Sequence, residues 1–264
     1  MLKAFFSSLP GWCVRQPAYM LLAAGDELLA SEPPGRFARA WVGLMVGSFG
    51  WGIFSMGVWA TAWRVFGDYF GLPLMPAVAV VAVTALWLYR LGFLALGEII
   101  GDGPAGGRSL GCSVVVAVLL FAMLGLKGWN PDWPTYLPPT WQWVRPRALY
   151  RVLILAPVWG AWSMIIVPRF CKPGKNTEPA VSAFSAGCGP LTAAACLVAP
   201  LAGSIVYFNY LQWTQLGISV ATVIAAIGGG LIFCRLVGGL NRKALLATNL
   251  LTQLVFFLAF LANR

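Results

Sequence analysis

The chain has 264 residues, of which 59% are hydrophobic and only 10% are charged, and its formal net charge is +10 with no histidine. Soluble domains carry about 25% charged residues, so this composition excludes an ordinary soluble protein. The lack of histidine removes the commonest general base at neutral pH and the commonest zinc ligand. Because the lysines and arginines gather between apolar runs, the basic charge indicates membrane topology and anionic lipid, and not nucleic acid.

Residues 1–36 form the least apolar long section, and we interpret them as an N-terminal arm. Within the arm, Pro17–Leu29 combines apolar side chains with an acidic end, which favours either a short helix on the membrane surface or a loose segment. Two prolines and a glycine at 33–35 end it. Residues 37–264 are predicted to be a single helical membrane domain.

Seven apolar runs follow the arm, each near the roughly 20 residues that a helix needs to cross a bilayer. Backbone N–H and C=O groups must be satisfied internally in lipid, so we predict helices and an all-α, polytopic membrane protein. The predicted spans are Trp41–Trp63, Pro73–Gly97, Leu110–Gly128, Leu149–Pro168, Gly189–Phe208, Leu216–Arg235 and Ala244–Ala262.

An acidic, glycine-rich segment, Glu98–Arg108, separates the second and third runs. Its carboxylates, Glu98 and Asp102, lie beside four glycines and precede Arg108. Two carboxylates at a flexible turn are candidate ligands for Mg²⁺ and a phosphate group. Alternatively, the acids solvate a helix end and the glycines form a tight turn.

The loop charges are asymmetric and set the predicted orientation. Eleven lysines and arginines fall on the side of the N-terminus and six on the other, with Arg90 inside a span. The positive-inside rule therefore predicts a multi-pass protein of the inner (cytoplasmic) membrane with its N-terminus in the cytoplasm. The eleven are Lys3, Arg15, Arg36, Arg39, Arg108, Arg169, Lys172, Lys175, Arg235, Arg242 and Lys243.

This orientation places the loops after the second, fourth and sixth spans on one surface. Glu98 and Asp102 are then candidate catalytic and metal-binding residues, and basic side chains nearby suit a phosphorylated ligand. The same basic residues are also explained by topology alone. The candidate substrate-binding residues are Arg108, Lys172, Lys175, Arg242 and Lys243.

On the predicted outer side, residues 128–147 contain four tryptophans and five prolines. Tryptophan favours the headgroup zone, so this loop is predicted to be a stiff lid on the membrane surface, with an aromatic ligand platform as the alternative. The six cysteines show no C-x-x-C spacing and several lie in apolar runs, which favours free buried thiols. They are Cys13, Cys112, Cys171, Cys188, Cys196 and Cys234.

Three segments resemble the adenosylcobinamide-GDP ribazoletransferase (cobalamin-5′-phosphate synthase) family. Leu153–Ile165, LILAPVWGAWSMI, is similar to one of that family's apolar helices, and Phe233–Leu261 is similar to its closing module. Leu72–Asp102, with the span before it, is similar in layout to the helices that lead into the family's acidic loop. The resemblance covers about residues 40–262 in order. It implies a Mg²⁺-dependent enzyme that joins adenosylcobinamide-GDP to α-ribazole, with aspartates of the cytoplasmic loops holding the metal.

The chain departs from the family pattern at the acids. The family's acid-rich loop is reduced to Glu98 and Asp102, and Lys243 stands where the closing module has an aspartate. Two functions therefore stay open: a transferase that binds Mg²⁺ weakly and takes a phosphorylated corrinoid, or a non-catalytic relative without cofactor. The second would be a structural or accessory subunit that contacts the lipid bilayer and other membrane subunits.

The lysine also suggests a specific contact. Opposite charges in a partly dry pocket attract by a few kcal/mol at an effective dielectric of about 20. We predict that Lys243 or Arg242 takes the place of the lost cation and pairs with Glu98 or Asp102. In the alternative, both basic side chains point to lipid headgroups.

The orientation yields a first testable prediction. Single cysteines at the positions of Lys175 and Trp133, introduced in a cysteine-free background, should react with an impermeant thiol reagent from opposite sides of the membrane. Lys175 should be labelled from the cytoplasmic face, because it follows the fourth span. Labelling of both positions from the same side would contradict this topology.

Overall fold

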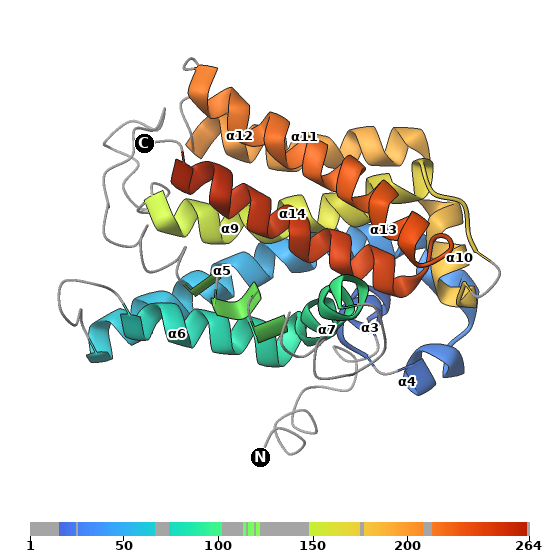
Figure 1. The fold of residues 1–264 in the computed structure, drawn as a ribbon, viewed down its shortest axis with the longest axis horizontal. Coiled ribbons are helices and arrows are strands. Elements are labelled where there is room, and N and C mark those ends of the chain that lie inside the picture. The colour runs from blue at the N-terminus through green and yellow to red at the C-terminus, as the bar shows by residue number, and fades with distance from the viewer. Residues whose placement is uncertain are drawn as a thin grey trace.

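The computed structural model of the protein describes residues 16–24, 26–66, 74–101, 148–174, 177–207 and 213–262, together with seven residues within 113–121. These residues are almost entirely helical, and they confirm the all-α prediction (Figure 1). The α-helices bounded in full are α3 (Pro17–Ala23), α4 (Asp26–Ser31), α5 (Ala40–Phe66), α6 (Leu74–Val83), α7 (Arg90–Ile100), α9 (Ala148–Ile166), α10 (Pro179–Gly187), α11 (Pro190–Tyr207), α12 (Trp213–Ile224), α13 (Gly230–Leu236) and α14 (Arg242–Ala262). Shorter 3₁₀ or π segments are η1 (Pro34–Arg39), η2 (Thr84–Leu88), η4 (Val167–Arg169) and η5 (Ala225–Gly229).

Five helical segments of the described chain are long and apolar enough to cross a membrane, so the protein is a polytopic membrane protein. Four of them match the fourth, fifth, sixth and seventh predicted spans within two residues, and the other contains the first predicted span but begins seven residues before it. Most of the third predicted span, Leu110–Gly128, lies outside the described residues, so the total of seven stays a prediction. The five segments are Pro34–Phe66, Leu149–Arg169, Pro190–Tyr207, Leu216–Leu236 and Arg242–Ala262.

The second predicted span is not one straight helix. Its two halves, Leu74–Leu86 and Arg90–Ile100, meet at an angle of 79°. Between them Thr84 donates its hydroxyl to Val80 O at 2.6 Å, and the backbone takes a π-helical turn that ends at Tyr89. A side-chain bond to the preceding turn and a π-turn are both known causes of helix bending. The apolar run showed the length of this segment but not its break.

Helix α9 lies at the centre of the bundle, with α11 on one side and α5 on the other (Figure 1). In its span, 89% of the most apolar stretch is buried, against 22% in the spans of α5 and α11. Those outer helices instead expose apolar side chains, which meet lipid in a membrane protein. The centre therefore consists of α9 and its neighbour α14, which contact each other along their lengths.

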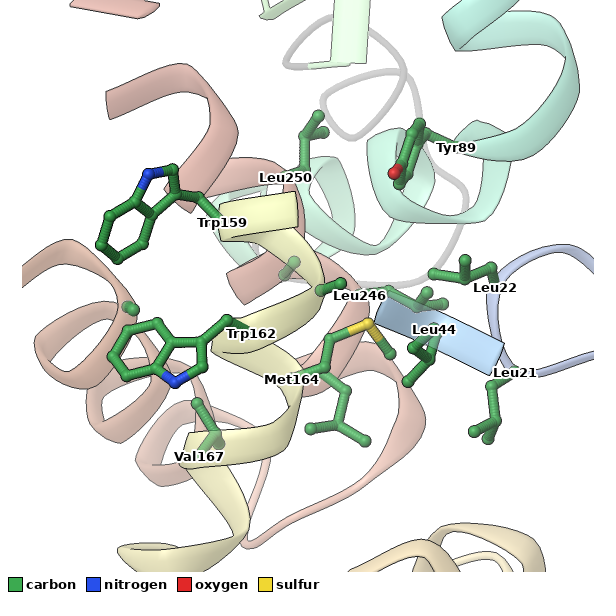
Figure 2. Packing of buried hydrophobic residues seen from close by; sticks show 14 of the residues in the cluster. Leu21, Leu22, Leu44, Tyr89, Trp159, Trp162, Met164, Val167, Leu246 and Leu250 are labelled. Carbon is green, nitrogen blue, oxygen red and sulfur yellow. The ribbon is translucent and has the colours of Figure 1, made fainter. Parts of the chain in front are cut away.

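Two tryptophans of α9 organise its packing. Trp159 and Trp162 are almost fully buried, and their rings meet edge to face with centroids 5.7 Å apart (Figure 2). Each indole N–H finds an acceptor on α11, because Trp159 donates to Ser204 Oγ at 3.2 Å and Trp162 donates to Ala193 O at 3.0 Å. Buried indole groups need such partners, so these bonds fix how α11 lies on α9.

The N-terminal segment that the structure describes packs against the helical bundle. Met20 and Leu21 of α3 are 1% and 0% exposed, and α3 contacts α5 and α7. The predicted helix over Pro17–Leu29 is therefore split into α3 and α4, with Ala24 in extended backbone between them. Its position at the membrane surface stays a prediction.

Gly52 offers a test of the packing between α5 and α9. A Cβ at Gly52 would lie 2.6 Å from Ile154 Cα and 2.7 Å from Ile154 O, so the two backbones leave no room for a side chain. We expect Gly52→Ala to lower the free energy of unfolding by roughly 2 kcal/mol, in the range for overpacking, as measured by thermal unfolding in detergent. Gly50→Ala on the same helix, where nothing lies within 4 Å, should leave stability unchanged.

Candidate functional site

The turn between α13 and α14 joins two loops that are far apart in the sequence. Gly238 and Gly239 have φ values of +78° and +133°, which favour glycine. A Cβ at Gly239 would also lie 2.5 Å from Gly174 Cα. Leu240 N then donates to Lys172 O at 2.9 Å, and Pro173 and Leu240 form a bridge. The connection after α9 is therefore held against the start of α14.

Asn241 begins α14 and sets the direction of the next two side chains. Its Oδ1 accepts a hydrogen bond from Ala244 N at 2.9 Å, which is the usual bond of an N-cap asparagine. Arg242 and Lys243 therefore occupy the first turn of the helix. Positive charge is unfavourable there because the N-terminal end of a helix carries partial positive charge. Both side chains need carboxylate or carbonyl partners, and both have them.

Lys243 forms an ion pair with Glu98. Its Nζ lies 2.6 Å from Glu98 Oε2, and Glu98 belongs to the last turn of α7. The sequence predicted this pairing as one of its options, and the structure confirms it. The lysine side chain is 55% exposed and the glutamate 19%, so solvent screens the attraction and the pair contributes at most about 1 kcal/mol to stability. The pair matters for the chemistry of the site, because the Lys243 ammonium group occupies the space beside the Glu98 carboxylate.

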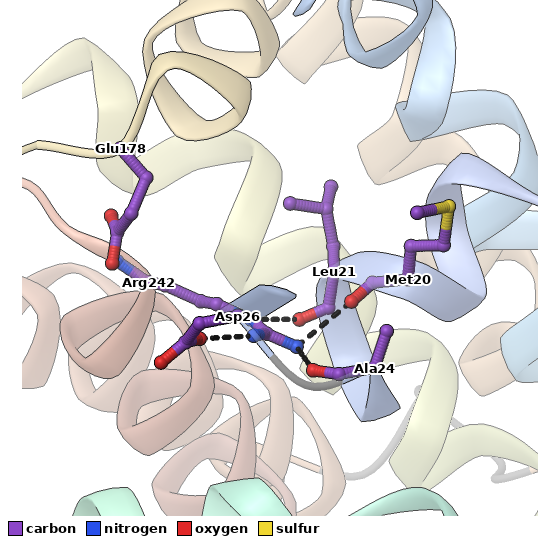
Figure 3. Close-up of polar contacts among 6 residues, drawn as sticks. All are labelled: Met20, Leu21, Ala24, Asp26, Glu178 and Arg242. Atoms are coloured by element: carbon purple, nitrogen blue, oxygen red, sulfur yellow. Dashed lines mark hydrogen bonds and ion pairs between the residues drawn. The ribbon is translucent and has the colours of Figure 1, made fainter. Parts of the chain in front are cut away.

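Arg242 points the other way, into the N-terminal segment (Figure 3). Its guanidinium donates from Nε to Leu21 O at 2.9 Å and from Nη2 to Met20 O at 2.8 Å and Ala24 O at 2.5 Å. Nη1 donates to Asp26 Oδ1 at 2.9 Å. The three carbonyls come from the C-terminal end of α3, where partial negative charge favours a cation. Arg242 is only 4% exposed and uses donors on all three nitrogens.

Two acidic residues complete the surroundings of Arg242. Asp26 is 91% exposed at its side chain and approaches the guanidinium from the solvent side. Glu178 Oε2 accepts a hydrogen bond from the backbone N of Arg242 at 3.3 Å. The side chain of Arg242 thus joins α14 to α3 and α4, while its backbone joins α14 to the residue before α10. We refer to Asp26, Glu98, Glu178, Arg242 and Lys243 as the α14 cluster.

The sequence predicted part of this cluster. Glu98, Arg242 and Lys243 were candidates, and the structure gathers them at one end of the bundle. Lys172 is exposed, and its backbone belongs to the same pair of loops. Asp102, Arg108 and Lys175 lie outside the described residues. Asp26, Glu178 and the carbonyls of α3 were not predicted, because nothing in a single sequence ties the N-terminal arm to residue 242.

The described residues do not fit a divalent metal ion. Among them, no three histidine, cysteine, aspartate or glutamate side chains gather as metal ligands would. Glu98 offers one carboxylate, and the Lys243 ammonium lies against it. Mg²⁺ prefers six oxygen ligands, and a neighbouring cation repels it. The site is therefore built as a set of ion pairs at a helix terminus.

Compared with protein-family models, with curated proteins and with solved structures, the chain matches none of them. Its fold and the α14 cluster define it as a helical, multi-pass membrane protein with an ion-paired polar end.

The Arg242 contacts generate a prediction about the N-terminal segment. We expect Arg242→Ala to lower the free energy of unfolding by roughly 3 kcal/mol, because it removes the buried side-chain donors from three carbonyls at the C-terminal end of α3. The free energy of unfolding of Arg242→Lys should lie between those of the wild type and Arg242→Ala, since one ammonium group cannot reproduce the planar set of guanidinium donors. Hydrogen exchange of residues 16–31 measures the effect directly and should accelerate. Arg235→Ala, an exposed arginine on α13, is the control; equal effects of both changes would contradict the assignment.

Proposed function

We propose that this chain is a non-catalytic accessory subunit of a larger membrane assembly, built on a scaffold that resembles ribazoletransferases. The observation that carries the proposal is the ion pair between Lys243 and Glu98. In the resembling family an aspartate stands at the place of Lys243 and would face a metal ion. Here a cation fixed in the chain stands beside the acid.

Phosphoryl transfer depends on positioning and on neutralising charge at the phosphate oxygens. A divalent ion at Glu98 would have to displace the Lys243 ammonium and would then lie beside a positive charge. Lys243 thus supplies the positive charge that a metal-dependent transferase takes from its ion. A lysine in place of a metal ion supports a structural role for this site, in which it joins helices, and not a catalytic role.

Arg242 supports the same proposal. A phosphate-binding arginine presents free N–H donors to its ligand. The guanidinium of Arg242 instead donates hydrogen bonds to three carbonyls at the end of α3 and to Asp26. A phosphorylated corrinoid or a pyrophosphate would gain this group only by detaching α3 from the bundle.

The outer helices supply faces for the bilayer and for partner subunits. Large apolar side chains are exposed along α5 and α11, including Val46 at 70%, Leu191 at 82% and Val198 at 62%. We propose that these faces lie in the cytoplasmic membrane, with the N-terminus inside, and that part of this apolar surface contacts other membrane subunits.

The test is an assay of the purified chain with adenosylcobinamide-GDP, α-ribazole and Mg²⁺. We expect no product from the wild type, and no saturable Mg²⁺ binding in calorimetry. Lys243→Ala should gain at most weak Mg²⁺ binding, which Glu98→Gln in addition should remove. Lys172→Ala, which removes an exposed lysine of the neighbouring loop, is the matched control. Turnover by the wild type that Glu98→Gln abolishes would show an enzyme and overturn the proposal.

Purification from native membranes in mild detergent addresses the positive half of the proposal. We expect a complex of fixed stoichiometry that contains other integral membrane polypeptides, with crosslinks to α5 or α11. A single chain in its micelle, with no crosslinked neighbour in the intact membrane, would contradict the accessory role.

A further inference from the structure

Two buried cysteines from distant parts of the sequence meet beside the α14 cluster. Cys171 follows η4 directly, and its backbone N donates to Val167 O at 3.0 Å. Its Sγ lies 3.7 Å from Gly230 O, which belongs to the helical turn before Cys234 on α13. Gly230 and Cys234 are four residues apart on α13, and a helical carbonyl points toward the residue four positions on, so the Cys171 thiol lies beside the turn that carries Cys234. Both residues are free cysteines, 7% and 5% exposed.

Tight packing keeps the two segments together. A Cβ at Gly230 would lie 2.3 Å from Val167 Cγ2, so the backbone of α13 presses against the residue that positions Cys171. On the other side of the pair, Leu240 N bonds to Lys172 O, one residue after Cys171. The segments that carry Cys171 and Cys234 are therefore held together by backbone contacts on both sides of the two cysteines.

The surroundings also distinguish Cys171 from Cys188, another buried thiol. The hydrogen bond from Cys234 and the positive charge of Arg235 lower the pKa of the Cys171 thiol below its ordinary value, although burial opposes this. By contrast, burial raises the pKa of Cys188 to about 12. The thiolate is the nucleophilic form of cysteine, so we expect Cys171 to react with an oxidant more readily than Cys188.

We propose that Cys171 and Cys234 are a redox modification site, at which a small peroxide converts the thiol pair to a reversible disulfide. The pair is independent of the accessory function proposed above, since it requires neither partner subunits nor the absence of catalysis. It places a covalent link between the connection that follows α9 and the helix that precedes α14.

The chemistry balances with hydrogen peroxide as the oxidant. The Cys171 thiolate attacks one peroxide oxygen, the O–O bond breaks, and hydroxide leaves, which gives a sulfenic acid at Cys171. The Cys234 sulfur then attacks the Cys171 sulfur; the S–O bond breaks, and the oxygen leaves as water with the proton of Cys234. Both sulfurs are oxidised, both peroxide oxygens are reduced to water, and a dithiol reverses the change by exchange.

The experiment uses the full chain in detergent or nanodiscs, treated with hydrogen peroxide and analysed by alkylation and peptide mass spectrometry. We expect a cross-linked peptide that joins Cys171 to Cys234, removed by dithiothreitol, and a higher midpoint of thermal unfolding in the oxidised sample. Cys188→Ser should keep the cross-link. Cys234→Ser should stop the reaction at the Cys171 sulfenic acid, which dimedone traps.

The wild-type measurement needs no variant, so a variant that fails to fold leaves the test intact. Unchanged alkylation of both cysteines after peroxide would overturn the proposal, and so would a disulfide from Cys171 to any other cysteine. If Cys188 formed adducts with peroxide as fast as Cys171, the assigned difference in reactivity would be wrong as well.

Discussion

The guanidinium of Arg242 is the constraint on which the polar end of this protein depends. A buried arginine must find acceptors for its N–H groups, because an unpaired buried charge costs several kcal/mol. Here the acceptors are the last carbonyls of α3 and the Asp26 carboxylate. The N-terminal segment is therefore part of the site, although the sequence shows it only as a weakly apolar arm. Neither α3 nor the start of α14 has a satisfied environment without the other.

Neighbouring residues of a helix point about 100° apart, and α14 uses this to serve two neighbours at once. Arg242 faces α3, while Lys243 faces the end of α7 and its Glu98. Gly238 and Gly239, with their positive φ values, allow the turn that precedes α14 and orients both side chains. Arg242 and Lys243, which look like a phosphate-binding pair in the sequence, therefore connect α14 to the N-terminal segment and to α7.

The sequence was sufficient for the features that depend on local pattern. Continuous apolar runs located α5, α9, α11 and α14 within a few residues, and the pairing of Lys243 with Glu98 was among the contacts that the sequence predicted. The sequence was insufficient for features that depend on three-dimensional contacts. The break at Thr84–Tyr89 depends on a hydroxyl bonding to the preceding turn, and threonine is common in unbroken helices. The partners of Arg242 are main-chain carbonyls, which every residue type provides, so no residue pattern marks them.

The bend between α6 and α7 separates the helix that carries Glu98 from the helix that packs on α5. Helix α6 packs on α5, whereas α7 packs on α14, where a Cβ at Gly92 would lie 3.4 Å from Leu246 O. With a 79° corner between them, the position of Glu98 is set by the packing of α7 on α14 and not by the direction of α6. Glu98 and Lys243 therefore belong to two helices that contact each other directly, so their ion pair joins parts of one packed unit.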